Sequence, residues 1–194
     1  MTSAMDRETI REALDAHQRM VAEFERTGTN AVVAAAEAIT RTFRRGGTLY
    51  LCGNGGSAAD AQHLAGEFVG RFRADRKALP AVALSTDTSV LTCIANDYDY
   101  STVFARQVEA YVKENDILWG FSTSGTSANV LKAAEAARDK GAQVIAFTGR
   151  PNSPLEALAD VCLCADAPLT ARSQEIHQLA YHIICDLVER CFCG

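Results

Sequence analysis

Two side chains that can exchange a proton or bind a metal ion stand four residues apart, at His63 and Glu67. The small and apolar residues around them favour a helix, and positions i and i+4 of a helix lie on one face. The imidazole and the carboxylate therefore point toward the same place. Residues 174–182 contain two more histidines. Imidazole and carboxylate groups from two helices could form a zinc site or an acid–base pair for proton transfer.

The spacing within this second run leaves open which histidine takes part. Gln174 and His182 are eight residues apart, so their Cα atoms are separated by roughly 12 Å along an ideal helix. Both could reach one ion only with extended side chains, an irregular helix or contributions from different subunits. On spacing alone His177 is the competing ligand, because it is nearer to Gln174 in height. Glutamine is also an uncommon zinc ligand.

A glycine-rich turn directly precedes the first pair. The apolar run from Thr48 to Cys52 predicts a buried strand, three glycines within residues 53–56 end it, and Ser57 is a good helix N-cap. Backbone N–H groups in such a turn can face an anion, and the dipole of the following helix favours negative charge there. A His–Glu pair at this spacing is usually an ordinary surface pair, but its place directly after this turn favours a functional site.

A second candidate anion site is Ser122-Thr-Ser-Gly-Thr-Ser127, which places five hydroxyl groups around one glycine after another apolar strand. Hydroxyl and N–H groups can surround a phosphate without a basic residue. The segment lacks the lysine of a P-loop, and the first turn has Ala58 where a dinucleotide fingerprint needs its third glycine. One serine-rich turn is often only a capped helix, but two such turns in a small domain favour phosphate binding.

The elements that must position these residues follow a simple pattern. Two helices come first, one within residues 7–26 and a second that Asn30 can cap and that ends at Gly46-Gly47. Apolar strands then alternate with helices, which is typical of a parallel sheet covered by helices on both faces. The strands are expected at residues 48–52, 79–84, 116–121, 143–148 and 160–164.

Ligands of such folds bind beyond the carboxyl ends of the strands, and both turns lie at such ends. The pair Asn96-Asp97 also follows a strand, one helix later, within a segment (residues 96–100) that we expect to be a loop. Residues 71–77 are polar and charged, so they are expected to form a surface link. The last helix is expected over residues 170–190.

The composition narrows the classes of partner. The 194 residues carry a net charge of -5 and no cluster of Lys and Arg, which argues against nucleic acid or an anionic membrane as the main partner. No apolar run approaches the ~20 residues that span a bilayer, and the polar N-terminus shows no signal-peptide core. The seven scattered cysteines contain no C-x-x-C pair and are expected to be free thiols. We therefore expect one cytoplasmic domain, residues 1–194.

Taken together, the motifs resemble those of the phosphoheptose isomerases, which are sugar isomerase (SIS) domain enzymes. The matching segments are Cys52-Gly-Asn-Gly-Gly-Ser57, His63-x-x-x-Glu67, Ala95-Asn-Asp97, Ser122-Thr-Ser-Gly-x-Ser127 and Gln174-Glu-x-His177-x-x-x-x-His182. The resemblance covers almost the whole chain. Enzymes of this family convert sedoheptulose 7-phosphate to D-glycero-D-manno-heptose 7-phosphate, the first step of nucleotide-activated heptose synthesis, which includes that of lipopolysaccharide precursors.

The resemblance implies a flavodoxin-like fold. This is a three-layer α/β/α sandwich with a central five-stranded parallel sheet, here with two additional N-terminal helices. The resemblance also implies a homotetramer, in which the N-terminal extension (residues 1–46) packs between copies and the active sites lie between subunits. The implied cofactor is one zinc ion per subunit. Its implied ligands are His63, Glu67, Gln174 and His182.

The same resemblance makes Glu67 and His182 the catalytic acid–base pair of an isomerisation through an enediol(ate). It therefore favours His182 over His177 as the histidine of the last helix. The residues implied to contact the sugar phosphate are Asn54, Gly55, Gly56, Ser57, Glu67, Asn96, Asp97, Ser122, Thr123, Ser124, Ser127 and Gln174.

Two alternatives belong to other functional classes. A related SIS protein binds a replication initiator protein without catalysis and lacks both the glutamate and the final histidine. A non-catalytic module that binds a sugar phosphate or such a protein is therefore one alternative, although this chain retains Glu67 and His182. The other alternative is an isomerase that acts on a hexose or pentose phosphate.

Overall fold

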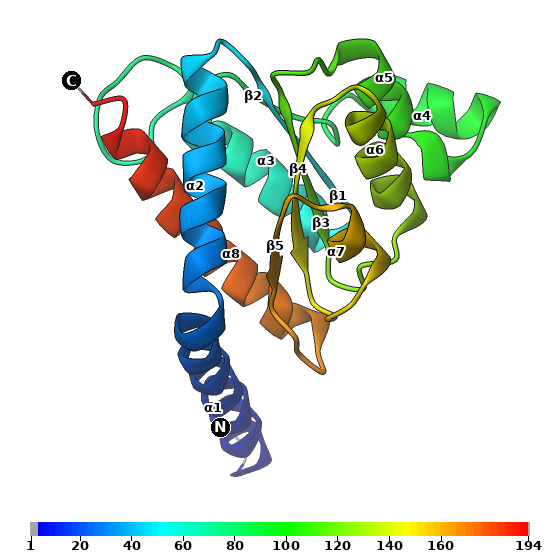
Figure 1. The fold of residues 1–194 in the computed structure, drawn as a ribbon. Coiled ribbons are helices and arrows are strands. Elements are labelled where there is room, and N and C mark those ends of the chain that lie inside the picture. The colour runs from blue at the N-terminus through cyan, green and yellow to red at the C-terminus, as the bar shows by residue number, and fades with distance from the viewer. Residues whose placement is uncertain (1–3, 194) are drawn as a thin grey trace.

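Five parallel strands form one sheet at the centre of the computed structural model, which describes residues 4–193 (Figure 1). The strands are β1 (Leu49–Gly53), β2 (Ala81–Ala83), β3 (Ile117–Ser122), β4 (Gln143–Thr148) and β5 (Val161–Cys164). Their order across the sheet is β2-β1-β3-β4-β5. The predicted five-stranded parallel sheet is confirmed, and the two strands that precede the candidate anion turns, β1 and β3, are neighbours.

Helices cover both faces of the sheet and complete the predicted three-layer sandwich (Figure 1). One face is covered by α2 (Thr29–Arg44), α3 (Gly56–Val69) and α8 (Thr170–Arg190). The other face is covered by α4 (Thr88–Asp97), α5 (Ala105–Tyr111), α6 (Ala128–Asp139) and α7 (Pro154–Leu158). Within residues 4–193, no helix has both the length and the apolarity that crossing a bilayer requires.

The two faces of the sheet bury different side chains. The layer beneath α3 and α8 contains Trp119, fully buried, with the rings of Phe121 and Phe147 at centroid distances of 5.3 and 4.8 Å. The layer beneath α6 is built mainly from aliphatic and alanine side chains, including Leu118. Successive residues of β3 alternate between the layers, as the period of a strand requires. Because α3 and α8 pack on the same layer and contact each other, they bring distant parts of the chain together.

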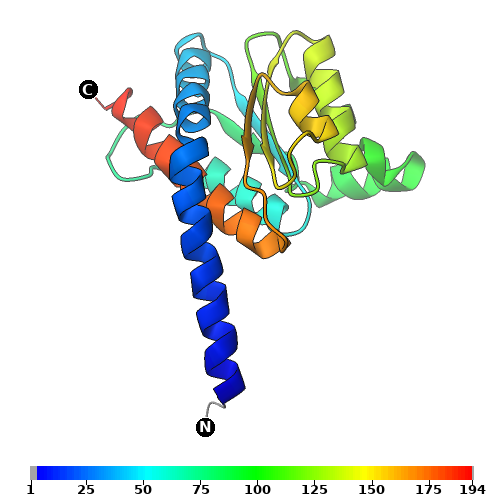
Figure 2. The same cartoon turned by 60° about the horizontal axis from the view of Figure 1, so that its bottom comes forward.

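The N-terminal helix α1 (Ala4–Thr27) packs against α8 along its second half, and its N-terminal end extends beyond the rest of the molecule (Figure 2). Gly28 separates it from α2 but keeps helical backbone angles, with φ -91° and ψ -18°. The prediction that Asn30 caps the second helix is therefore wrong, because the chain is already helical before this residue. The exposed large apolar side chains of α1 are those of Met5, Ile10 and Leu14.

Other local structure also differs from the sequence prediction. The strand expected at residues 79–84 is only three residues long. Asn96 and Asp97 form the last residues of α4 and are not part of a loop, because this helix starts at the Asp87 cap and continues to Asp97. The short helix α7, capped by the Ser153 hydroxyl, was not predicted.

Candidate active site

Three side chains from two distant helices meet at one point, which we call the His–Glu–His cluster. His63 and Glu67 lie on one face of α3, His182 reaches them from α8, and their ligand-capable atoms all lie within 4.8 Å of one another. His63 Nε2 is 3.0 Å from Glu67 Oε1. The rings of His63 and His182 meet edge to face, with centroids 5.0 Å apart. A single chain thus brings together a carboxylate and two imidazoles.

A hydroxyl group holds His63 from the other side of its ring. Tyr181 Oη lies 3.0 Å from His63 Nδ1 and donates to Asp60 Oδ1 at 3.4 Å. Burial raises the pKa of Tyr181, with the Asp60 carboxylate as a further cause, so the hydroxyl keeps its proton. Tyr181 Oη thus faces Nδ1, and Nε2 on the other side of the ring pairs with Glu67 Oε1 at 3.0 Å. Such partners orient metal-binding imidazoles.

The His182 ring lies against Phe72, with stacked rings whose centroids are 5.7 Å apart. Partial burial lowers the pKa of His182, the nearby His63 adds to this effect, and Glu67 opposes it. The neutral imidazole is therefore favoured near pH 7. A neutral imidazole can take up a proton or bind a metal ion.

His177, the competing candidate on spacing, lies in the core. It is fully buried, its Nε2 donates to the Thr148 carbonyl oxygen at 2.9 Å, and its ring lies 5.3 Å from that of Phe147. Burial lowers the pKa of His177 to about 4. Five residues, or about 140° around the helix, separate it from His182. It therefore faces the sheet and does not reach the cluster.

Gln174 stands apart from the cluster within this chain. Its side-chain amide lies against the start of α3, where a Cβ added to Gly56 would be 2.6 Å from Gln174 Nε2. His63 comes seven residues later on α3, which corresponds to about 10 Å along the helix. The structure therefore brings three of the four expected zinc ligands together and leaves the fourth near the glycine-rich turn.

The glycine-rich turn after β1 starts α3 in a way that the sequence did not predict. Gly55 precedes the helix with φ 55° and ψ -121°, a conformation that residues with a side chain rarely adopt. Ser57, predicted as the N-cap, is the second residue of the helix and is buried, so this prediction is wrong. The freedom of Gly55, and not a serine hydroxyl, lets the chain turn into α3. Gly55 and Gly56 are exposed at the helix N-terminus.

The serine-rich turn after β3 is held partly by its own hydroxyl groups. Ser122 Oγ lies 2.9 Å from Ser127 Oγ and 3.3 Å from Ser124 Oγ. Ser122 is buried, Thr123 and Ser127 are half-buried, and Ser124 is exposed. This graded exposure leaves a cluster of hydroxyl groups open to solvent at the start of α6, where the helix dipole favours an anion.

Close contacts fix both turns relative to each other. Gly125 has a φ of 67°, and a Cβ there would lie 2.2 Å from that of Ser153, so only glycine fits. The amides of Asn54 and Asn129 exchange two hydrogen bonds, of 2.9 and 2.8 Å, which join the first turn to the start of α6. The Tyr100 hydroxyl also donates to Asn54. The two turns therefore form one continuous polar edge beyond β1 and β3.

Asn96 and Asp97 lie at the exposed end of α4. The Asn96 amide donates to Asp97 Oδ1 at 2.8 Å, and the Cys93 thiol donates to Asp97 Oδ2 at 3.5 Å. These contacts connect the pair within its own helix and do not join it to either turn.

Known proteins with similar sequences and structures show which family this chain belongs to. The SIS domain family model matches residues 14–149. The phosphoheptose isomerase of Roseiflexus sp. (strain RS-1) is 56% identical over 159 residues, which are 82% of this chain and 81% of that protein. The chain belongs to the phosphoheptose isomerase family. The family resemblance and the expectation of an isomerase enzyme are thereby confirmed.

Solved structures of phosphoheptose isomerases share the whole fold. The structure of phosphoheptose isomerase GmhA from Neisseria gonorrhoeae matches with a TM-score of 0.89 and 42% identity, over 95% of this chain and 98% of that one. The structure of a phosphoheptose isomerase from Francisella tularensis matches with a TM-score of 0.91 and 34% identity, over 94% and 97% of the two chains. The likeness includes the sandwich and most of the N-terminal extension.

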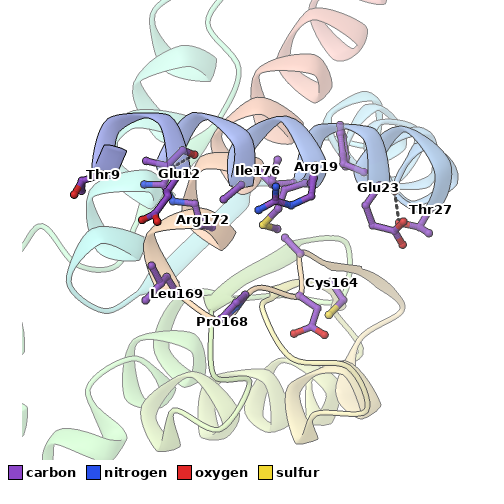
Figure 3. A pocket seen from close by; sticks show the side chains of 17 residues that line it. Thr9, Glu12, Arg19, Glu23, Thr27, Cys164, Pro168, Leu169, Arg172 and Ile176 are labelled. Carbon is purple, nitrogen blue, oxygen red and sulfur yellow. Dashed lines mark hydrogen bonds between the residues drawn. The ribbon is translucent and has the colours of Figure 1, made fainter. Parts of the chain in front are cut away.

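A cavity of this phosphoheptose isomerase family member lies beside α1 (Figure 3). Its volume is about 550 Å³, and it lies between α1 and the segment that joins β5 to α8. Apolar side chains such as Met20, Phe24 and Ile176 line it, while Arg19 comes from α1 and Arg172 from α8. None of the predicted site residues lines this cavity.

Several residues around the cluster were missed by the sequence reasoning. Tyr181 and Asp60 hold His63, Phe72 packs on His182, and Asn129 pairs with Asn54. A weak signal existed for two of them, because Tyr181 is next to His182 and Asp60 precedes His63 by one helical turn. The other two contacts depend on how the elements pack.

Proposed function

We propose that the chain converts sedoheptulose 7-phosphate to D-glycero-D-manno-heptose 7-phosphate, as a ketose–aldose isomerase. The observation that supports this most is the convergence of Glu67 and His182 in a member of the phosphoheptose isomerase family. The relatives that bear this name match most of the chain. A non-catalytic SIS module would not require a carboxylate and an imidazole at this distance from each other.

The reaction moves hydrogen between neighbouring carbons of the open-chain sugar. Glu67 removes a proton from C1, and the electrons of that bond form the C1–C2 double bond of an enediol(ate). The proton of the C1 hydroxyl passes to the C2 oxygen as the C1 carbonyl forms. His182, which is neutral near pH 7, takes up a proton from solvent and gives it to C2, and Glu67 returns its proton to solvent. General acid and base groups of this kind contribute about 10²–10⁴-fold to the rate.

The donor set of the cluster fits a zinc ion. Two imidazole nitrogens and one carboxylate oxygen within 4.8 Å of one another are ligands that zinc prefers. His63, Glu67 and His182 would hold the ion, and Gln174 would come from a second copy of the chain, because its own protomer places it beside Gly56. When bound, the ion would polarise the sugar oxygens as a Lewis acid.

The hydroxyl-rich turn would bind the phosphate at the other end of the sugar. Ser122, Thr123, Ser124 and Ser127 would donate to it, with Ser57 and the N-terminus of α3 nearby. Binding of the phosphate would fix one end of the flexible open-chain sugar, which lowers the entropic cost of reaching the reactive geometry. The residues that would contact the sugar itself are Asn54, Gly55, Gly56, Glu67, Asn96, Asp97 and Gln174.

The N-terminal extension supports a homotetramer. Along α1, Met5, Ile10 and Leu14 are 75%, 55% and 58% exposed, and Ile10 and Leu14, one helical turn apart, share one face that an interacting helix could cover. The cavity beneath α1 is lined by apolar side chains such as Met20 and Phe24 together with charged ones such as Arg19 (Figure 3). We propose that α1 helices of other copies cover these surfaces, so that residues 1–46 assemble the oligomer.

The cellular setting follows from the same proposal. All seven cysteines are free thiols, which supports a reducing compartment such as the cytoplasm. There the product would enter the synthesis of nucleotide-activated heptose.

The test is turnover of sedoheptulose 7-phosphate by purified protein whose zinc content has been measured, with and without a chelator. We expect aldose phosphate to form, and the chelator to reduce the rate. Hexose and pentose ketose phosphates are assayed side by side, and faster turnover of one of them would change the substrate assignment. Binding of sugar phosphate without any turnover would support the non-catalytic module and refute the proposal.

A further inference from the structure

A charged pair with almost no solvent contact lies beneath the cluster. The side chains of Arg76 and Glu189 are only 1% and 4% exposed, and Arg76 Nε is 3.1 Å from Glu189 Oε1. Arg76 belongs to residues 71–77, which the sequence predicted as a surface link. That prediction is wrong for Arg76, because its guanidinium group turns inward to meet α8.

The Glu189 carboxylate holds the segment that follows α3. It accepts hydrogen bonds from the backbone N–H groups of Phe72, Arg73 and Ala74, at 2.9, 2.8 and 2.9 Å. Phe72 is the residue whose ring stacks on His182. Glu189 lies seven residues after His182 on the same helix. The carboxylate therefore sets the position of a ring that packs against His182.

The Arg76 guanidinium group holds the end of α3 itself. Its Nη2 donates to the backbone carbonyl of Glu67 at 2.8 Å, and its Nη1 donates to that of Phe68 at 2.9 Å. These carbonyl groups lie in the last turn of the helix, where a positive charge is favourable. Arg76 thus bonds directly to the backbone of the residue that carries the proposed base.

Stability alone is a weak reason for such a pair. Removing two charges from water costs several kcal/mol each, and well-packed apolar side chains in their place are often as stable or more stable. Glu189 is also unfavourably placed, because a carboxylate near the C-terminus of α8 meets the negative end of the helix dipole. What the pair does provide is a fixed geometry between the ends of α3 and α8.

We propose that Arg76 and Glu189 are positioning residues that hold Glu67 and His182 in their reactive arrangement. The inference rests on the proposed function, since it takes these two residues as the acid–base pair. Each member of the buried pair acts through another group: Arg76 through the Glu67 backbone, and Glu189 through the segment that carries Phe72. A displacement of about 1 Å at a reacting group can cost about a hundredfold in rate.

The test is Glu189→Gln, compared with Asp160→Asn as a control for loss of a carboxylate that accepts a backbone N–H. Asp160 also accepts a backbone N–H, that of Val144 at 2.7 Å, and its other oxygen is 3.9 Å from Arg138, but it lies at β5, far from the cluster in the fold. We expect Glu189→Gln to lower kcat about ten- to a hundredfold. Its KM for sedoheptulose 7-phosphate should change less than about threefold, because the phosphate turn is untouched. Asp160→Asn should keep the wild-type kcat.

A second readout does not depend on turnover. Zinc affinity, measured by competition with a chelating dye, should fall about tenfold or more in Glu189→Gln, because groups that orient ligands contribute this much. Asp160→Asn should keep the wild-type affinity. If wild type turned over no sugar phosphate, the proposed function would fail, while the affinity comparison would still decide whether the pair positions the cluster.

A double variant covers the case in which Glu189→Gln does not fold. Arg76→Met with Glu189→Leu removes both charges together, so that neither is left buried and unpaired, and circular dichroism establishes that the assayed protein is folded. We expect it to show the same loss of kcat and zinc affinity, because the bonds to the Glu67 carbonyl and to residues 72–74 are gone. A folded variant with wild-type kcat and zinc affinity would overturn the proposal and leave the pair a purely structural role.

Discussion

The substitution Glu67→Gln should separate activity from stability. It removes the carboxylate that we propose as the base and keeps nearly the same shape. The contact it alters most is with His63, and the two side chains are 21% and 41% exposed. A polar contact this open to solvent contributes about 1 kcal/mol or less to stability. For a chain of this size that corresponds to a change in Tm of about 4 °C at most.

The expected loss of activity is much larger. Loss of a general base costs about 10²–10⁴-fold, or about 2.7 to 5.4 kcal/mol in the activation barrier. Initial rates on sedoheptulose 7-phosphate give kcat, and proton NMR in D2O follows exchange of the C1 hydrogen. Both should fall together in Glu67→Gln, because the base acts at C1.

Glu175→Gln is the matched control. Glu175 also pairs with a histidine, His17, at 2.8 Å and at similar exposure, but it joins α8 to α1 and not to the cluster. It should keep a kcat close to that of wild type. A kcat of Glu67→Gln within about threefold of wild type would refute the assignment of the base. A large drop in its Tm would show that the carboxylate serves the fold, contrary to the reasoning from its exposure.

Three further predictions concern the turn, the cluster and the core. Ser124→Ala should raise KM about tenfold with little change in kcat, because a hydrogen bond to a charged phosphate is lost; steady-state kinetics would contradict a binding role if only kcat fell. Tyr181→Phe should weaken zinc binding about tenfold, since the hydroxyl no longer orients His63; an unchanged affinity in a chelator competition would argue against this orientation. His177 is neutral when buried, so the unfolded chain binds a proton that the folded chain does not, between the ordinary pKa of 6.5 and about 4. Stability should therefore fall by about 3 kcal/mol as pH is lowered through this window, and urea unfolding of His177→Gln should show a flatter pH dependence than wild type.

The centre of the sheet was predictable because β3 and nearly all of β4 are buried on both faces. β3 and β4 are continuous apolar runs between turn residues, and such runs have few alternatives in a chain that alternates strands with helices. The end of α4 was harder, because Asn96 and Asp97 are typical loop residues and nothing local shows that the helix continues through them. Likewise, Ser57 has the composition of a cap, but the conformation of Gly55 makes a cap unnecessary.

The sequence predicts which site residues lie together only where they belong to the same helix. His63 and Glu67 follow from the helical period, whereas the choice between His177 and His182 depends on which side of α8 faces the sheet. His177 is favoured by its height along the helix, but the rotation of about 140° between it and His182 turns it toward the sheet. Arg76 was missed for a similar reason, since a charged residue in a polar segment gives no sign that a carboxylate more than a hundred residues later will draw it inward.

The buried position of Trp119 gives the molecule an optical reporter of its own. It is the single tryptophan of the chain, it is fully enclosed, and it sits in the aromatic layer on which α3 and α8 rest. Its emission should lie at short wavelength in the native state and shift to the red when water enters that layer. Intrinsic fluorescence can thus follow the loosening of the layer that supports the chemistry without any attached label.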